Sequence, residues 1–318
     1  MAHHLVLGAG GIGRATAAAL VARGETVTLA SRSGTSVDLE GVSTLALDAT
    51  DADAVAGAAS TAATIINAVS PVNYTHWDRD WPPIANALLQ AAERSGAGLV
   101  TVSNLYGYGK VDAPMTEATP LRPNGIKGEV RARMWTDAFT AYQQGRIRAT
   151  ELRASDYFGP GAGRLVSYLQ GFVIRPLIEG KSTLRLPVGD PHAPHSWTYL
   201  ADIGELAAVL ATDDRSWGRA WHVPTAPPLS MAEVAAQVAA LIQAPPPRVR
   251  RIPAAAMWAA HVVPLVRALD ETKHQFEQSF VIDASAAEST FGFRPTAWAT
   301  ALAETVASLT SGHVAAAA

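Results

Sequence analysis

The sequence predicts an α/β protein built on a doubly wound parallel sheet, with a smaller C-terminal region attached to it. Short apolar runs alternate with helical segments through the first half of the chain, which is the pattern of repeated strand–helix units. The first apolar run, residues 3–7, passes directly into a glycine-rich turn, Gly8–Gly13, and an alanine-rich helical segment follows. Such a turn between a first strand and a first helix is typical of sheets that bind phosphate at the helix N-terminus.

The remaining elements follow from the same alternation. Strands are expected over 25–30, 43–47, 64–67, 98–102 and 146–153, and helices over 14–23, 82–95, 126–144 and 201–211. Pro82 and Pro83 are expected to open their helix, because proline fits the first helical turn. The predicted domains are a nucleotide-binding domain of residues 1–160, to which 201–224 return, and a substrate-binding region of 161–200 and 225–318.

The composition excludes several classes of protein. A net charge of −3 gives no basic footprint for nucleic acid, and no apolar stretch approaches the length of a membrane span. The N-terminus has no basic segment before its apolar run, so a cytoplasmic protein is expected. The absence of cysteine excludes thiolate chemistry, and the nine histidines show no spaced ligand set, so no metal is expected. We expect a small-molecule substrate and a monomer or homodimer.

The glycine turn has the pattern Gly-x-Gly-x-x-Gly of a dinucleotide-binding site. Its glycines let the backbone approach a pyrophosphate, which the first amides of the following helix would hold. The residues expected to contact the dinucleotide here are Gly8, Gly10, Gly11, Ile12 and Gly13.

The end of the second strand indicates which dinucleotide is bound. Proteins that prefer NAD usually place an acid there for the ribose hydroxyls, whereas this chain has Ser31 and Arg32. Arginine suits a 2'-phosphate, so NADP(H) is the expected cofactor. Arg32 could also be a simple exposed loop residue, but no acid competes with it within residues 30–34. Arg14 is a second candidate for the 2'-phosphate, although a helix-surface arginine is equally expected there.

With these residues placed, the chain resembles the extended short-chain dehydrogenase/reductase family over nearly its whole length. The resemblance rests on several motifs in order: the glycine turn, Asp48, Asn67-Ala68, Ser103 to Gly107, Lys127, Arg153 to Gly161, and Ser196 to Asp202. It implies a Rossmann domain whose nicotinamide faces a cleft against the C-terminal region. The cofactor contacts that it implies beyond the turn are Asp48 and Ala49 at the adenine, Asn67, Ala68 and Val69 over the cofactor, Lys127 at the ribose and Ser155 at the nicotinamide. Asp48 is equally suited to cap the next helix, and Asn67 to an ordinary strand end.

Two departures from the family pattern bear on function. The first fingerprint glycine is replaced by Leu7, and the family's Tyr-x-x-x-Lys pair lacks its tyrosine, because Pro123 precedes Lys127 by four residues. That tyrosine transfers the proton that accompanies the hydride. The remaining proton sources are Ser103, a phenol of Tyr106 or Tyr108, or a hydroxyl of the substrate itself. The catalytic residues we predict are Ser103, Lys127 and Tyr106. Ser103 is as readily a structural strand-end hydroxyl, and Lys127 part of a charged helix face with Arg131 and Arg133.

The function expected from these features is an NADPH-dependent ketoreductase of antibiotic-type metabolism. Among members without the tyrosine, the chain resembles ketoreductases that act on polycyclic aromatic polyketides, whose phenols can assist protonation. Trp77, Trp81, His195 and Trp197 would then line an aromatic pocket, although core packing is the default for any single tryptophan. One alternative is a nucleotide-sugar epimerase or dehydratase, which Pro123 disfavours because sugar oxidation needs a base. A second alternative is a redox sensor that binds NADP without catalysis.

Overall fold

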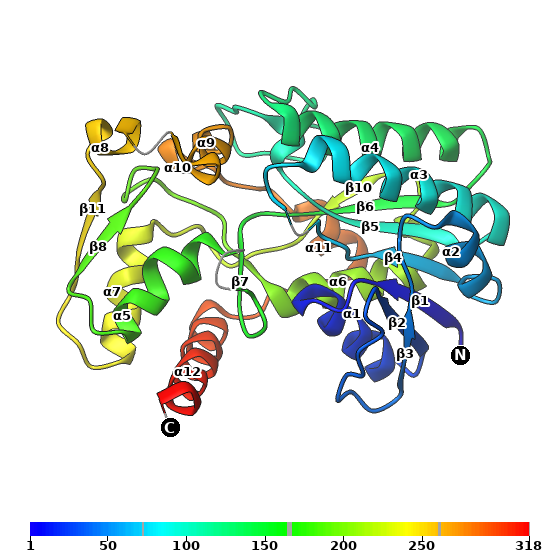
Figure 1. Cartoon of the computed structure of the whole chain (residues 1–318), viewed down its shortest axis with the longest axis horizontal. Coiled ribbons are helices and arrows are strands. Elements are labelled where there is room, and N and C mark those ends of the chain that lie inside the picture. Colours follow the sequence, from blue (N-terminus) through cyan, green and yellow to red (C-terminus); the bar gives the residue numbers. More distant parts are fainter. Residues whose placement is uncertain (72, 164–166, 260–261, 318) are drawn as a thin grey trace.

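A seven-stranded sheet in the order β10-β6-β5-β4-β1-β2-β3 forms the framework of the larger lobe in the computed structural model, which describes residues 1–71, 73–163, 167–259 and 262–317 (Figure 1). Every neighbouring pair in this sheet is parallel. Its strands are β1 (His3–Leu7), β2 (Thr26–Ser31), β3 (Val42–Ala46), β4 (Thr64–Asn67), β5 (Gly98–Asn104), β6 (Ala149–Ala154) and β10 (Ala220–His222). The predicted doubly wound sheet is therefore confirmed.

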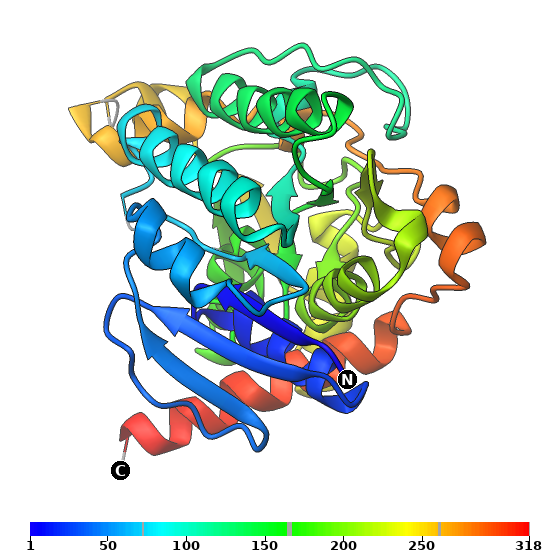
Figure 2. The ribbon, with the colours of Figure 1, turned by 90° about the vertical axis from the view of Figure 1, so that its right-hand side faces the viewer.

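Helices cover both faces of this sheet. One face carries α2 (Ala52–Ala58), α3 (Trp77–Ser95) and α4 (Ile126–Gln143), and the last two lie side by side (Figure 2). The other face carries α1 (Gly11–Ala22), α6 (Leu200–Thr212) and α11 (Ser285–Phe291). Because β1 lies between β2 and β4, the order of the strands reverses at β1, and the ligand-binding cleft of doubly wound sheets is expected at the carboxyl ends of these strands.

Helix α3 differs from the prediction. It begins at Trp77, so Pro82 and Pro83 lie inside it rather than at its start. Each proline removes a helical N–H donor, which costs stability. Trp77 and Trp81 offset this cost, since they stand four residues apart on the buried face and are 6% and 0% exposed.

The smaller lobe is assembled from segments that leave and re-enter the sheet domain. Its apolar core joins side chains of β8, α5, α7 and α12. Its elements are β7 (Tyr157–Phe158), a π-helical turn Gln170–Ile174, α5 (Arg175–Ile178), β8 (Thr183–Leu186), β9 (Thr198–Tyr199), α7 (Met231–Leu241), β11 (Arg248–Arg251), α8 (Ala254–Ala259), α9 (Pro264–Asp270), α10 (His274–Glu277) and α12 (Trp298–Ala317). Across the described residues, no helix is both long enough and apolar enough to cross a bilayer.

Candidate active site

The glycine turn lies at the switch point of the sheet, against the loop after β4. Gly8 has φ +106°, and a Cβ there would lie 2.5 Å from the Ala68 carbonyl oxygen. A Cβ at Gly13 would lie 1.8 Å from the Gly8 oxygen, whereas one at Gly10 would meet no atom within 4 Å. Gly8 and Gly13 are thus required by the fold, and Gly10 leaves open space in front of α1.

Two further observations fit a dinucleotide at this place. Helix α1 begins after Gly10 without a side-chain cap, so its first amides are available to a phosphate. Asn67 is fully buried at the end of β4, where its Oδ1 accepts the Val69 N–H at 3.2 Å. Its Nδ2 has no hydrogen-bond partner among the described residues, which leaves a donor for a bound group.

The ends of β2 and β3 bring Arg32 near Asp48. Hydrogen bonds from Thr50 lower the pKa of Asp48, and the charge of Arg32 contributes to this shift. Asp48 does not cap α2, because Asp51 accepts the N–H groups of that helix. Arg32 and Asp48 are both exposed at the rim where the adenosine half of a dinucleotide would lie.

Lys127 and Arg131 point inward from α4. They are 5% and 7% exposed, whereas the Arg133 side chain is 84% exposed, so only Arg133 belongs to a solvated charged face. Pro123 precedes the helix, which begins at Ile126. The four-residue spacing of the family's Tyr-x-x-x-Lys pair recurs on one helix face as Lys127 and Arg131.

Glu271, which follows α9, closes over the start of α4. Its Oε2 accepts the Lys127 ammonium at 2.8 Å, and its Oε1 accepts the Lys127 backbone N–H. Gly125 makes this approach possible, because a Cβ there would lie 2.2 Å from the Glu271 Cγ. The ribose contact of Lys127 stays a prediction, and any ribose would share this ammonium with Glu271.

Two phenols lie beside Lys127. The Tyr74 and Tyr106 hydroxyls are 3.1 Å apart, and the Lys127 Nζ lies 4.7 Å from the Tyr74 ring centre. Burial raises the pKa of both tyrosines, and the carboxylate of Asp156 raises it further. Tyr106 therefore holds its proton more tightly than an ordinary tyrosine.

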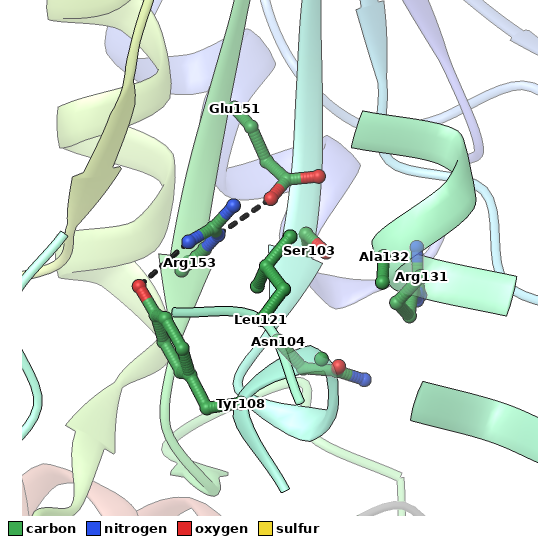
Figure 3. A pocket seen from close by; sticks show the side chains of 9 residues that line it. Ser103, Asn104, Tyr108, Leu121, Arg131, Ala132, Glu151 and Arg153 are labelled. Atoms are coloured by element: carbon green, nitrogen blue, oxygen red, sulfur yellow. Dashed lines mark hydrogen bonds and ion pairs between the residues drawn. The ribbon is translucent and has the colours of Figure 1, made fainter. Parts of the chain in front are cut away.

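Ser103 is a buried residue of β5. It is 6% exposed, and its side chain helps to lower the pKa of Glu151, a neighbour on β6, against the larger effect of burial, which raises it. Figure 3 shows the small pocket around it, from Ser103 and Glu151 to Tyr108 and Arg131. A role for Ser103 as proton donor stays a prediction.

The pocket holds a buried ionic network that the sequence did not reveal. Arg153 donates Nε to Glu151 and Nη1 to the Tyr108 hydroxyl, both at 2.6 Å. The Tyr108 hydroxyl lies 2.7 Å from His222 Nε2. Arg131 stacks on Trp81 at 4.1 Å, and burial lowers its pKa to about 10. These groups hold α4 on the sheet. The Tyr108 hydroxyl is engaged in hydrogen bonds with Arg153 and His222 and is therefore not available to a substrate.

The tryptophans expected to line an aromatic pocket are core residues. Trp77 and Trp81 lie in the apolar core beneath α3, and Trp197 lies in the core of the smaller lobe at 3% exposure. His195 is also buried, against the Trp197 and Phe276 rings. The predicted aromatic pocket is wrong, because burial of these large rings stabilises the fold.

Sequence reasoning missed two polar groups at this edge of the sheet. Glu271 is 144 residues from Lys127, and no local pattern marks it. Asp156 pairs with His195, whose Nε2 lies 3.0 Å from Asp156 Oδ2. Asp156 stands in the Arg153 to Gly161 segment, one of the motifs on which the family resemblance rests. A charged residue in that segment could have been predicted as a site residue. Ser155, expected at the nicotinamide, donates its backbone N–H to Thr198 Oγ1.

Comparison with protein families settles the relationship. The sequence profile of the NAD dependent epimerase/dehydratase family matches residues 4–223. The chain belongs to that family. Among curated protein sequences, none matches this chain.

Several solved structures share this fold over nearly the whole length of the chain. The dTDP-glucose 4,6-dehydratase of Bacillus anthracis, in complex with NAD, matches with a TM-score of 0.81 and 17% identity, over 99% of this chain and 98% of its own. The dTDP-glucose 4,6-dehydratase of Streptomyces venezuelae, with NAD bound, matches with a TM-score of 0.77 and 21% identity, over 98% of each chain. The UDP-glucose 4-epimerase of Thermus thermophilus, in complex with NAD, matches with a TM-score of 0.76 and 20% identity, over 96% of this chain and 98% of its own. At these identities the likeness establishes the fold.

These comparisons correct the expected function. The similar structures are nucleotide-sugar dehydratases and epimerases, so the expectation of a ketoreductase for aromatic polyketides is wrong. The expectation rested on the resemblance to ketoreductases that lack the tyrosine, and the tryptophans, which lie in the core, give it no support.

Proposed function

We propose that this chain is an oxidoreductase that uses NADP(H) and acts on the sugar of a nucleotide-linked sugar. The observation that carries the proposal is the polarity of the cleft edge. Lys127, Glu271, Asp156 and the hydroxyls of Tyr74 and Tyr106 gather there, while the tryptophans lie in the core. Hydroxyl groups and carboxylates are the partners that a polyhydroxylated substrate needs. The family and the full-length likeness to nucleotide-sugar enzymes support the same substrate class.

The cofactor would be held by the glycine turn, the first amides of α1, Asn67 and the Arg32 rim. When bound, its nicotinamide supplies or accepts a hydride at a sugar carbon. Arg32 favours NADP(H), because a guanidinium can bind a 2'-phosphate through two parallel hydrogen bonds. Glu271 and Lys127 would orient a sugar hydroxyl or carbonyl at the carboxyl end of β5.

Calorimetric titration tests this proposal. NADP⁺ and NAD⁺ are titrated first, and UDP-glucose and dTDP-glucose are then titrated into the cofactor-loaded protein, with free glucose and a polycyclic phenol as comparisons. We expect tighter binding of NADP⁺ than of NAD⁺, and binding of a nucleotide sugar but not of free glucose. Binding of the polycyclic phenol alone would contradict the proposed substrate class.

A further inference from the structure

Two buried histidines have different hydrogen-bond surroundings, and the difference sets their protonation. His222 Nδ1 lies 3.0 Å from the Asp283 carbonyl oxygen, so Nδ1 carries a proton. Its Nε2 faces the Tyr108 hydroxyl, which accepts from Arg153 and therefore donates to His222. A neutral imidazole satisfies both contacts, and burial lowers the pKa of His222 accordingly.

At His195, the shortest contact of each ring nitrogen is to an acceptor. Nδ1 lies 3.1 Å from the Gln275 carbonyl oxygen, whereas Nε2 lies 3.0 Å from Asp156 Oδ2 and 3.4 Å from the Ser155 hydroxyl oxygen. A carbonyl oxygen and a carboxylate cannot donate, so both nitrogens need protons for both bonds to form. The Trp197, Phe276 and Phe280 rings lie 4.2, 5.1 and 5.5 Å from the imidazole centre. Phe276 stacks at an angle of 8°, and aromatic faces favour a cation.

Asp156 connects this histidine to the cleft. His195 is 3% exposed, whereas the Asp156 side chain is 18% exposed. Asp156 stands two residues beyond β6, whose last residue pairs with Asn104 of β5. The titratable groups that feel its charge are the phenols of Tyr74, Tyr106, Tyr157 and Tyr168. The carboxylate therefore lies at the carboxyl edge of the sheet, where the reacting carbon is expected.

We propose that Asp156 and His195 form a shared-proton pair that exchanges a proton with the substrate oxygen, the task left without a tyrosine in this chain. This inference rests on the proposed function. A bound nicotinamide would supply a hydride to a sugar carbonyl carbon, whose C=O bond would become C–O. The oxygen would take one proton, which leaves His195 Nε2 and passes through Asp156 Oδ2, so His195 ends neutral and Asp156 remains a carboxylate. In the reverse direction, the pair would take the hydroxyl proton while a bound oxidised nicotinamide would accept the hydride.

Nitrogen NMR of the whole, histidine-labelled protein tests the pair without substrate or cofactor, with His195→Gln used to assign the signal. In one spectrum of both histidines we expect two ring N–H protons on His195 and one on His222. Asp156→Asn should remove the Nε2 proton of His195. A singly protonated His195 in the wild-type protein, or one that Asp156→Asn does not change, would overturn the pair.

Kinetics test the proton exchange. With NADP(H) and the nucleotide sugar that binds, Asp156→Asn and His195→Gln should each lower kcat roughly 100-fold or more, with little change in the KM for NADP(H). The matched control is His192→Gln, a substitution of an exposed histidine of the same loop, which should keep wild-type kcat.

If the Asp156→Asn protein does not fold, the kcat of His195→Gln tests the role of the pair. A kcat within 3-fold of wild type overturns the role. If no nucleotide sugar reacts, the proposed function fails and the proton exchange with it, while the NMR result still decides the pair.

Discussion

At the scale of single residues, the candidate site depends on which charges are buried and what faces them. Lys127 and Arg131 are equally buried on one helix face, yet Lys127 has the Glu271 carboxylate at 2.8 Å while Arg131 lies on tryptophan rings. The shortest contact of Nε2 is to the Tyr108 hydroxyl in buried His222 and to the Asp156 carboxylate in buried His195. Residue type alone predicts none of these differences, because each partner comes from a distant part of the chain.

Arg32 should set the preference between the two dinucleotides. In Arg32→Asp we expect the Kd for NADP⁺ to rise roughly 10- to 100-fold, because a charge-assisted contact to the 2'-phosphate is lost, while the Kd for NAD⁺ changes little. Arg133→Gln serves as the control, since the Arg133 side chain is 84% exposed on α4. Equal effects of Arg32→Asp on both cofactors, measured by calorimetry, would be incompatible with this role.

Glu151 should be essential for stability. In Glu151→Leu the Arg153 and Arg131 guanidinium groups stay buried without their carboxylate, so we expect a loss of about 3–5 kcal/mol in unfolding free energy. The comparison is Glu93→Leu, which breaks an exposed ion pair with Arg146 and should cost less than about 1 kcal/mol. Urea denaturation measures both, and similar losses in the two variants would refute the difference.

At the scale of elements, the sequence predicts the sheet domain well and the smaller lobe poorly. Strands β1 to β5 and helix α4 lie within a few residues of their predicted ranges, because each is a local run of apolar or helical pattern. Helix α3 begins five residues before Pro82, because buried Trp77 outweighs the local preference of proline. In the candidate site, the glycine turn was predictable from local spacing. Glu271 and the Asp156–His195 pair were not, because they form by packing of distant segments.

The glycine turn offers a matched pair of substitutions. In Gly13→Ala the new Cβ would overlap the Gly8 oxygen, so we expect a loss of at least about 2 kcal/mol in stability. In Gly10→Ala the new Cβ meets open space, so stability should change by less than about 1 kcal/mol. The same Cβ would occupy the approach of a pyrophosphate, so the Kd for the dinucleotide should rise at least about 10-fold.

Thermal melts and cofactor titrations of both variants distinguish these effects. A Gly10→Ala protein that binds the dinucleotide with unchanged Kd would contradict the placement of the pyrophosphate at α1.

At the scale of the whole molecule, buried histidines should couple stability to pH. Burial lowers the pKa of His4, His222 and His274 in the folded chain below the ordinary value of 6.5. The unfolded chain therefore binds more protons below pH 6.5, and stability falls as the pH drops through that value. Between pH 7.5 and 5.5, each such histidine should cost up to about 1.4 kcal/mol of unfolding free energy.

His222→Asn tests this coupling by denaturation at several pH values. The variant is expected to be less stable than wild type at pH 7.5 but to lose less stability on acidification, whereas His76→Asn at an exposed position keeps the wild-type slope. Equal slopes in His222→Asn and wild type would show that His222 does not remain neutral in the fold.

The central claim is that this chain performs redox chemistry on a nucleotide-linked sugar, and proton NMR of the sugar tests it most directly. UDP-glucose and dTDP-glucose are incubated in D₂O with the protein and NADP⁺ or NAD⁺, beside the Asp156→Asn variant. The account predicts new sugar resonances from epimerised, dehydrated or oxidised product with the wild-type protein, formed fastest with NADP⁺, and a strongly reduced rate with Asp156→Asn. Unchanged sugar spectra after prolonged incubation with a protein that binds both ligands would contradict it.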